Sequence, residues 1–171
     1  MMKTIQALVA CSDLTGYARF SARKPEGEIF QLLSDYYELV GDVIEPARGN
    51  VIKFMGDAAL ILFPEDAADE GVRAMLALQS RGDRFWSDRG ADCRHHLRIH
   101  FGPMGLGPLG TRSDKRADVL GSTVNTLFLL KASGFALTPE AFRKLAPETR
   151  KLFKKHTPPM FYIPTDQPHR D

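Results

Sequence analysis

The chain has 171 residues, of which 43% are hydrophobic, and this length and composition suit one domain with a single core. Its 23 basic and 21 acidic residues are mixed along the sequence and leave a formal net charge of +2, so we expect neither a nucleic-acid nor a membrane partner. Two cysteines provide neither a disulfide framework nor a zinc site, and no apolar run approaches the roughly 18 residues of a membrane-spanning helix, so we expect a cytoplasmic protein.

The periodicity of apolar residues divides the chain into strands and helices. Short continuous apolar runs predict buried strands, whereas apolar residues that recur every three or four positions predict amphipathic helices. Pro46 and Gly49 end the longest helix, and Gly56 and Asp57 form the turn of a hairpin. The expected strands are 4–12, 50–55, 58–63, two short strands around Gly102 and Pro103, 134–138 and 160–164; the expected helices are 26–47, 65–86, 121–133 and one or two short ones within 139–155.

The order of these elements predicts the fold class. Strand, helix, strand, strand, helix, strand is the ferredoxin-like βαββαβ arrangement, an α+β fold in which one layer of helices packs on an antiparallel-rich central sheet. We expect one domain over residues 1–165 and a flexible tail over 166–171. Because this fold supports many chemistries, function has to be inferred from the site residues.

Two aspartates stand where the predicted fold brings chain segments together. Asp13 ends the first strand and Asp57 occupies the hairpin turn, and the first strand and a hairpin strand are neighbours in a ferredoxin-like sheet. Carboxylate oxygens suit hard divalent cations, and a helix that begins after Asp13 presents the backbone amides of Thr15, Gly16 and Tyr17 to phosphate oxygens. Aspartate is also favoured as a helix cap and in turns, so the residues alone leave a purely structural role open.

Four motifs, in order along the chain, resemble those of the class III nucleotidyl cyclase catalytic domain. "CSDLTGY" (11–17) resembles the first metal motif of that family, and "NVIKFMGDAALILF" (50–63) resembles its lysine, glycine, aspartate hairpin. "RIHFGPMGLGPLG" (98–110) is similar to the family's strand with a His-x-Gly-Pro turn, and "DVLGSTVN" (118–125) to the signature before its catalytic helix. The resemblance covers most of the chain.

The resemblance implies a homodimer that converts ATP to 3′,5′-cyclic AMP and pyrophosphate at sites built from both chains. It assigns two Mg²⁺ or Mn²⁺ ions to Asp13, Asp57 and the carbonyl group of Leu14. It assigns recognition of the base to Lys53 and Asp118 of the other subunit. An ammonium donor and a carboxylate acceptor suit adenine, whereas guanine would need a different edge.

The catalytic helix departs from the family pattern. Asn125 matches the residue that the family uses on the ribose and in the transition state, but the family's transition-state arginine corresponds to Leu129. The family's phosphate-binding arginine corresponds to His96, although Arg98 lies two residues later on the same strand face and is expected to bind phosphate. Because losing one preorganised donor typically costs roughly 10²- to 10³-fold in rate, we expect weak activity.

Two functions therefore remain open. The first is an adenylate cyclase, which the two metal carboxylates, the base-reading pair and Asn125 favour. The second is a catalytically inactive cyclase-like module that binds nucleotide or protein and dimerises, which Leu129 and His96 favour. In either case we expect regulation to come from a separate protein, from metal or from dimer assembly.

Overall fold

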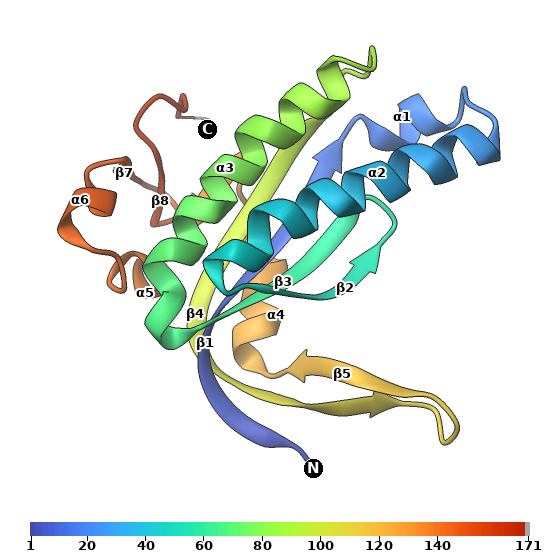
Figure 1. Cartoon of the computed structure of the whole chain (residues 1–171). Coiled ribbons are helices and arrows are strands. Elements are labelled where there is room, and N and C mark those ends of the chain that lie inside the picture. Colours follow the sequence, from blue (N-terminus) through green and yellow to red (C-terminus); the bar gives the residue numbers. More distant parts are fainter. Residues whose placement is uncertain (170–171) are drawn as a thin grey trace.

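The structure, a computed structural model, describes residues 1–169 and is built around a mostly antiparallel sheet of eight strands (Figure 1). Its main path runs β2-β3-β1-β4-β6-β8-β7, with β5 paired to β4 beside this path. Only the pairing of β4 with β6 is parallel among the strand pairs of this described part. The strands are β1 (Lys3–Thr15), β2 (Asn50–Met55), β3 (Ala58–Pro64), β4 (Arg94–Gly110), β5 (Lys115–Leu120), β6 (Phe135–Leu137), β7 (Phe153–His156) and β8 (Phe161–Pro164).

Helices cover both faces of this sheet. The long helices α2 and α3 lie on one face, and α4 lies on the other (Figure 1). The expected α+β fold is thus confirmed, but the expected single layer of helices is wrong because α4 forms a second one. The helices are α1 (Tyr17–Ser21), α2 (Glu26–Ile44), α3 (Ala68–Ser87), α4 (Ser122–Leu129), α5 (Pro139–Phe142) and α6 (Pro147–Arg150), with short 3₁₀ turns at Glu45–Ala47 and Glu65–Ala67.

Strand β1 is the centre of the core because both of its faces are buried. Leu8 and Ala10 pack with the residues of α2 and α3, whereas Val9 and Cys11 pack with those of α4. Successive side chains of a strand point to opposite faces, so a strand between two helix layers has no polar side. This explains why the sequence shows a continuous apolar run there.

Strand β4 differs from the prediction of two short strands around Gly102 and Pro103. It is one strand of 17 residues that passes through both positions without a turn. Gly102 is required for a close approach, since a Cβ atom there would lie 2.7 Å from Oγ1 of Thr123 at the start of α4. The glycine that signalled a turn therefore lets α4 pack against the sheet.

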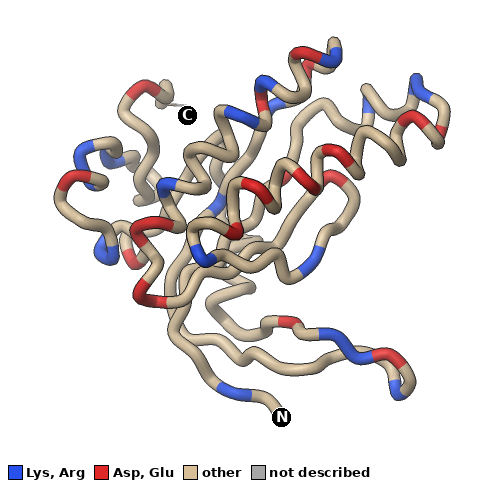
Figure 2. The backbone as a smooth tube through the Cα atoms, in the orientation of Figure 1, with Lys and Arg blue, Asp and Glu red and all other residues tan. Residues whose placement is uncertain are grey.

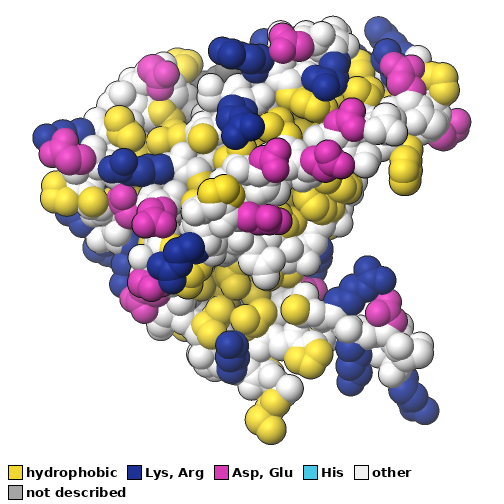
Figure 3. Space-filling view, viewed as in Figure 1, with side chains coloured by type: hydrophobic (Ala, Val, Ile, Leu, Met, Phe, Trp, Pro, Cys, Tyr) yellow, Lys and Arg dark blue, Asp and Glu magenta, His cyan; other side chains and the backbone are white. Residues whose placement is uncertain are grey.

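The end of β4 and the unpredicted strand β5 form an arm that projects from the body (Figure 1). Basic residues are frequent near its tip, whereas acidic residues recur along α2 (Figure 2). Apolar side chains gather where the arm joins the body (Figure 3). A cavity of about 330 Å³ lies there, and residues of its lining include Met2, Thr4, Leu109 and Leu120.

Several helix boundaries also differ from the prediction. The helix expected over 26–47 ends at Ile44 and continues as a 3₁₀ turn, and the helix expected over 121–133 ends at Leu129. Residues 153–156, expected within a helix, form β7. Within the segment expected to be a tail, Gln167 hydrogen-bonds to Phe135 of β6, and residues 170 and 171 lie outside the described part.

Helix α3 approaches the sheet closely because it carries a glycine over an aromatic ring. A Cβ atom on Gly71 would lie 2.6 to 2.9 Å from three ring atoms of Phe63, which is completely buried in β3. Neither the ring nor the helix has room to yield, since interiors are packed at crystal-like density. Any larger residue at position 71 therefore forces α3 away from β3.

We predict that Gly71→Ala lowers the free energy of unfolding by about 1 to 3 kcal/mol, the usual cost of overpacking a core. Urea denaturation followed by circular dichroism measures this change. Gly27→Ala in α2 is the matched control, because a Cβ atom there meets nothing within 4 Å and alanine is the better helix former. A Gly71→Ala protein as stable as the wild type would show that the contact with Phe63 is not tight.

Candidate active site

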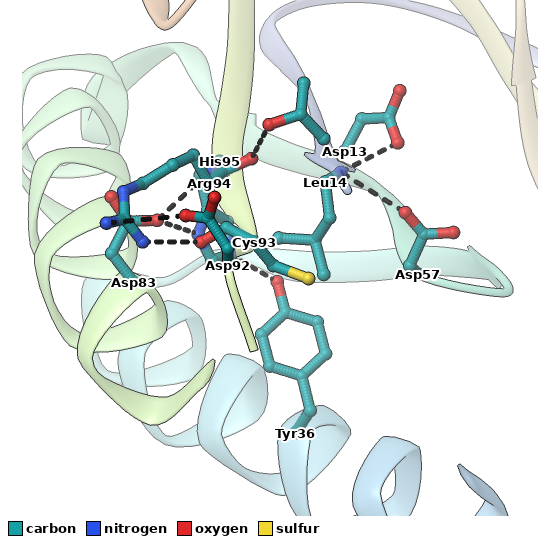
Figure 4. A network of polar contacts seen from close by, with 10 residues as sticks. Asp13, Leu14, Tyr36, Asp57, Asp83, Asp92, Cys93, Arg94 and His95 are labelled. Atoms are coloured by element: carbon teal, nitrogen blue, oxygen red, sulfur yellow. Dashed lines mark hydrogen bonds and ion pairs between the residues drawn. The ribbon is translucent and has the colours of Figure 1, made fainter. Parts of the chain in front are cut away.

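The carboxylates of Asp13 and Asp57 converge on one backbone amide (Figure 4). The N–H of Leu14 donates to Oδ1 of Asp13 at 2.8 Å and to Oδ2 of Asp57 at 3.3 Å. This meeting follows from the sheet, because β1 ends next to β3 and Asp57 lies in the turn that precedes β3. The structure thus brings together the two aspartates that the sequence placed at one edge.

The two carboxylates repel each other at this site. The pKa of Asp57 is raised, first because the carboxyl group is partly buried and then because the negative charge of Asp13 is near. A divalent cation between the two groups would relieve both costs. Mg²⁺ commonly binds one or two carboxylates and completes its coordination with water and substrate phosphates.

Two carboxylates at one place are the kind of ligand set that suits an open cation site. Within residues 1–169, no group of three or more histidine, cysteine, aspartate or glutamate side chains is placed to hold a metal ion. A cation here would therefore take Asp13, Asp57 and the carbonyl oxygen of Leu14 from the chain and its remaining ligands from outside it. Such an open site suits a substrate that itself carries phosphate oxygens.

Arg98 is the cation that the fold places beside the carboxylate pair. Its Nη2 lies 3.9 Å from Oδ2 of Asp13, and its Nη1 donates to the carbonyl oxygen of Phe128 at 3.4 Å. Its Nε is buried and has no hydrogen-bond partner among the described residues. The guanidinium group is thus held between β1 and the end of α4, with part of its donor capacity unused. His96 stands directly opposite Asp13 in the pairing of β1 with β4.

The strand expected to end at Asp13 continues to Thr15, and Gly16 leads from it into α1, which begins at Tyr17. Gly16 has φ +82°, and a Cβ atom there would lie 2.5 Å from the carbonyl oxygen of Asp92, so only glycine fits. The hydroxyl group of Thr15 donates to the carbonyl oxygen of Arg94 at 3.2 Å. The backbone of this turn is therefore fixed against the start of β4.

Lys53 and Asp118 form an ion pair across two strands that are far apart in sequence. Nζ of Lys53 lies 2.7 Å from Oδ2 of Asp118, and their side chains are 41% and 22% exposed. The other carboxylate oxygen, Oδ1, accepts a hydrogen bond from the N–H of Val119 at 2.8 Å. The structure thus brings together, within one chain, the two residues that the sequence assigned to recognition of a base.

Asn125 and Leu129 occupy the exposed face of α4. They are four residues apart and so lie one above the other on the helix, and Leu129 is 77% exposed. Lys53 stands opposite Leu60, a residue of the cluster under α4, so the ion pair lies on the same side of the sheet as this helix. The Lys53–Asp118 pair and Asn125 therefore share one side of the sheet.

Sequence reasoning missed a buried hydrogen-bonded chain on the opposite side of the sheet. Asp83, His95 and Tyr36 are joined in this chain (Figure 4), and Tyr37 separately donates to the carbonyl oxygen of Gly56 at 2.5 Å. The only signal in the sequence is Gly82 inside a helix, where a Cβ atom would collide with the ring of His95.

Comparisons with known proteins agree with the geometry. No family model matches the chain. It is 30% identical over 121 residues to an adenylate cyclase of Anabaena cylindrica, covering 66% of this chain and 24% of that protein. It is 26% identical over 123 residues to adenylate cyclase 1 of Rhizobium meliloti, covering 67% and 18%. The chain thus spans at most about a quarter of the length of these two relatives.

Solved structures show the same fold over nearly the whole chain. The adenylyl cyclase CyaB from P. aeruginosa superposes with a TM-score of 0.83 at 16% identity, covering 98% of this chain and 97% of that one. The guanylyl cyclase Cya2 gives 0.79 at 18% identity, with coverages of 94% and 91%. The fold is that of a cyclase homology domain. Together with the sequence similarity to adenylate cyclases, it identifies the chain as a class III adenylyl/guanylyl cyclase catalytic domain.

No helix within residues 1–169 is both long and apolar enough to cross a membrane.

We predict that the Lys53–Asp118 pair contributes less than about 1 kcal/mol to folding, because exposed ion pairs gain little in water. A double-mutant cycle with Lys53→Met, Asp118→Asn and the double variant, measured by urea denaturation, gives the coupling free energy. High salt should reduce it further. A coupling above about 2 kcal/mol would instead make the pair a structural element.

Proposed function

We propose that the domain is an adenylate cyclase that converts ATP to 3′,5′-cyclic AMP and pyrophosphate in a homodimer. The single observation that supports this most is the convergence of Asp13 and Asp57 on the amide of Leu14. Two carboxylates at the open end of a central strand suit cation-assisted phosphoryl chemistry, and the fold belongs to a family of nucleotidyl cyclases. The reaction joins the ribose 3′ oxygen to the α-phosphorus and breaks the bond from that phosphorus to the pyrophosphate oxygen.

The proposed cofactors are two Mg²⁺ or Mn²⁺ ions held by Asp13, Asp57 and the carbonyl oxygen of Leu14. When bound, such ions supply positive charge for the triphosphate and lower the pKa of the attacking hydroxyl group. Asp13 and Asp57 contribute by fixing this charge at one place on the sheet edge. Because the two aspartates already share a hydrogen-bond donor, little rearrangement is needed to hold a cation.

Lys53 and Asp118 are proposed to read the adenine base. The ammonium group has three donors and a carboxylate has several acceptor sites, so each group can contact the base while the two stay bonded to each other. A donor and an acceptor at the 2.7 Å spacing of this pair match the ring nitrogen and the exocyclic amine of adenine. By the family resemblance, this pair serves the carboxylate site of the other subunit.

The phosphates are proposed to be bound by Arg98 and by the backbone amides of Thr15, Gly16 and Tyr17. Arg98 is supported by its position 3.9 Å from Asp13 and by its unpartnered Nε. Asn125 is proposed to orient the ribose from the exposed face of α4. Positioning of the 3′ oxygen in line with the leaving group accounts for most of the rate in such reactions.

A second copy of the chain is the proposed partner. The arm and α4, which carry Asp118 and Asn125, each expose two large apolar side chains: Leu109 and Leu120 on the arm, and Phe128 and Leu129 on α4. The cavity at the base of the arm has a mainly apolar lining, and Leu120, one of its lining residues, is 56% exposed. Burial of such surface stabilises association by about 25 cal/mol per Å² before the costs of binding.

Weak turnover is proposed because Leu129 offers no donor to the developing charge. Its side chain is 77% exposed, one helical turn beyond Asn125, where the family pattern has an arginine. The same observation favours the second candidate function, a catalytically inactive module that binds nucleotide or a regulatory protein. The presence of Asp13, Asp57 and the Lys53–Asp118 pair favours the enzyme.

We predict that the purified protein forms cyclic AMP from ATP with Mn²⁺ and, more slowly, with Mg²⁺. Asp57→Asn should lower this rate by roughly 10²-fold or more, because it removes a charge from the proposed cation site. Mass spectrometry of the products from ATP, GTP, CTP and UTP measures both activity and base preference.

Asp88→Asn, an equivalent change at an exposed position at the end of α3, is the control and should leave the rate unchanged. If intact dimers form no cyclic nucleotide from any of the four substrates, the binding module becomes the better description.

We predict that Leu129→Arg raises kcat about 10- to 100-fold with little change in KM, because a restored donor acts mainly on the transition state. Steady-state kinetics with ATP and Mn²⁺ test this. Leu152→Arg adds the same charge at another exposed leucine and should change neither constant. Equal rates in the two variants would mean that Arg98 or another group already supplies the missing charge.

A further inference from the structure

Two adjacent tyrosines of α2 form hydrogen bonds to the two chain segments that flank the carboxylate pair. Tyr36 is completely buried, and its hydroxyl group lies 2.6 Å from Nε2 of His95. Tyr37 is partly exposed, and its hydroxyl group donates to the carbonyl oxygen of Gly56, the residue before Asp57. Adjacent residues of a helix point about 100° apart, so one helix contacts both the sheet and the hairpin turn.

The hydrogen bond between Tyr36 and His95 is extended by a second one, from His95 to Asp83 on α3. Oδ1 of Asp83 accepts hydrogen bonds from the backbone N–H of His95 at 2.9 Å and from its Nδ1 at 2.8 Å. Because Nδ1 carries the proton, Nε2 is the acceptor for the hydroxyl group of Tyr36. Burial raises the pKa of Tyr36, which keeps its proton in place as the donor. The chain Asp83–His95–Tyr36 therefore has a single direction of donation, with every member satisfied.

A glycine in α3 provides the space for this hydrogen-bonded chain, although glycine destabilises a helix. Gly82 stands in the interior of α3, and a Cβ atom there would lie 2.3 Å from Cε1 of His95. Glycine in a helix interior is unfavourable, and a buried histidine and tyrosine are unfavourable unless both are hydrogen-bonded. An apolar pair would fill the same space more simply. The hydrogen bonds must therefore contribute directional constraint as well as packing.

This constraint acts next to the carboxylate pair. His95 on β4 stands directly opposite Leu14 on β1, whose amide serves both Asp13 and Asp57. On the hairpin side, Tyr37 holds the carbonyl oxygen of Gly56 and stacks on Phe54, with ring centroids 3.7 Å apart. Helix α2 thus holds the strand end that carries Asp13 and the turn that carries Asp57.

We propose that Tyr36 and Tyr37, with His95 and Asp83 behind them, are positioning residues through which α2 sets the spacing of Asp13 and Asp57 and thereby the affinity of the pair for a divalent cation. This inference rests on the proposed function for its cation, but the positioning itself does not require turnover. These four side chains act through the backbone of residues 14 and 56 and not by contact with a substrate.

The test removes one hydroxyl group at a time. Tyr36→Phe and Tyr37→Phe keep the rings and their packing. Tyr162→Phe is the matched control, because Tyr162 stacks on Phe142 and lies in β8, near the opposite edge of the sheet from the hairpin. Mn²⁺ affinity is measured without nucleotide by electron paramagnetic resonance titration, with Asp57→Asn defining the site-specific signal. Hydrogen exchange of residues 13–15 and 56–58 is measured on the same proteins.

We expect about three- to tenfold weaker Mn²⁺ binding and faster exchange at 13–15 and 56–58 in Tyr36→Phe and Tyr37→Phe, and no change in Tyr162→Phe. Unchanged affinity and unchanged exchange in both variants would overturn the proposal. Faster local exchange, with no Asp57-dependent Mn²⁺ binding even in the wild type, would support the positioning and contradict the cation site of the proposed function. Because Tyr37 is partly exposed, its variant keeps the test informative if Tyr36→Phe does not fold.

Discussion

The burial of β1 on both faces is the constraint on which the rest of the structure depends. Leu8 and Ala10 face α2 and α3, and Val9 and Cys11 face α4, so a slip of one residue would exchange the two sets. The alternation fixes the register of β1 against both β3 and β4. It therefore also fixes which side of the sheet receives Asp13, the first charged residue that the strand presents beyond its apolar run.

This register places the residues of the proposed site and the residues that hold the strand end on opposite faces of β1. Asp13, two residues before the end of β1, belongs to the same strand face as Cys11, the face that α4 covers farther along the strand. Arg98 stands opposite Cys11 on β4. Leu14 turns to the other face, where it stands opposite His95. One face thus carries the charged residues, and the other carries the buried hydrogen bonds that hold the strand end. Because adjacent residues serve the two faces, a movement on the support side is transmitted to the carboxylates over one residue.

Much of this arrangement could be predicted from the sequence, and the failures have physical causes. The strands of the sheet centre and the meeting of Asp13 with Asp57 depend on local signals, an apolar run followed by a turn and a tight hairpin. The continuity of β4 does not depend on a local signal. Gly102 is needed because a side chain there would collide with Thr123, which lies 21 residues away in sequence. The second helix layer was missed because α4 has apolar residues on its exposed face as well, including Phe128 and Leu129. The buried chain was missed because nothing near His95 in sequence indicates that Tyr36 and Asp83 are its partners.

The proposed site has two neighbouring carboxylates, so its charge balance depends on the cations that lie beside them. Asp13 and Asp57 lie close enough for burial and mutual repulsion to raise the pKa of Asp57, and Arg98 forms an ion pair with Asp13. An arginine at position 129 would have added a second one from α4, in the partner subunit if the dimer forms as proposed. With leucine there, the proposed reaction would rely on bound metal ions and on Arg98 to offset the developing charge on the phosphate. Under the proposed function, the precision with which α2 holds the carboxylates would then affect the rate more than in a site with a full set of arginines, because fewer groups share the stabilisation.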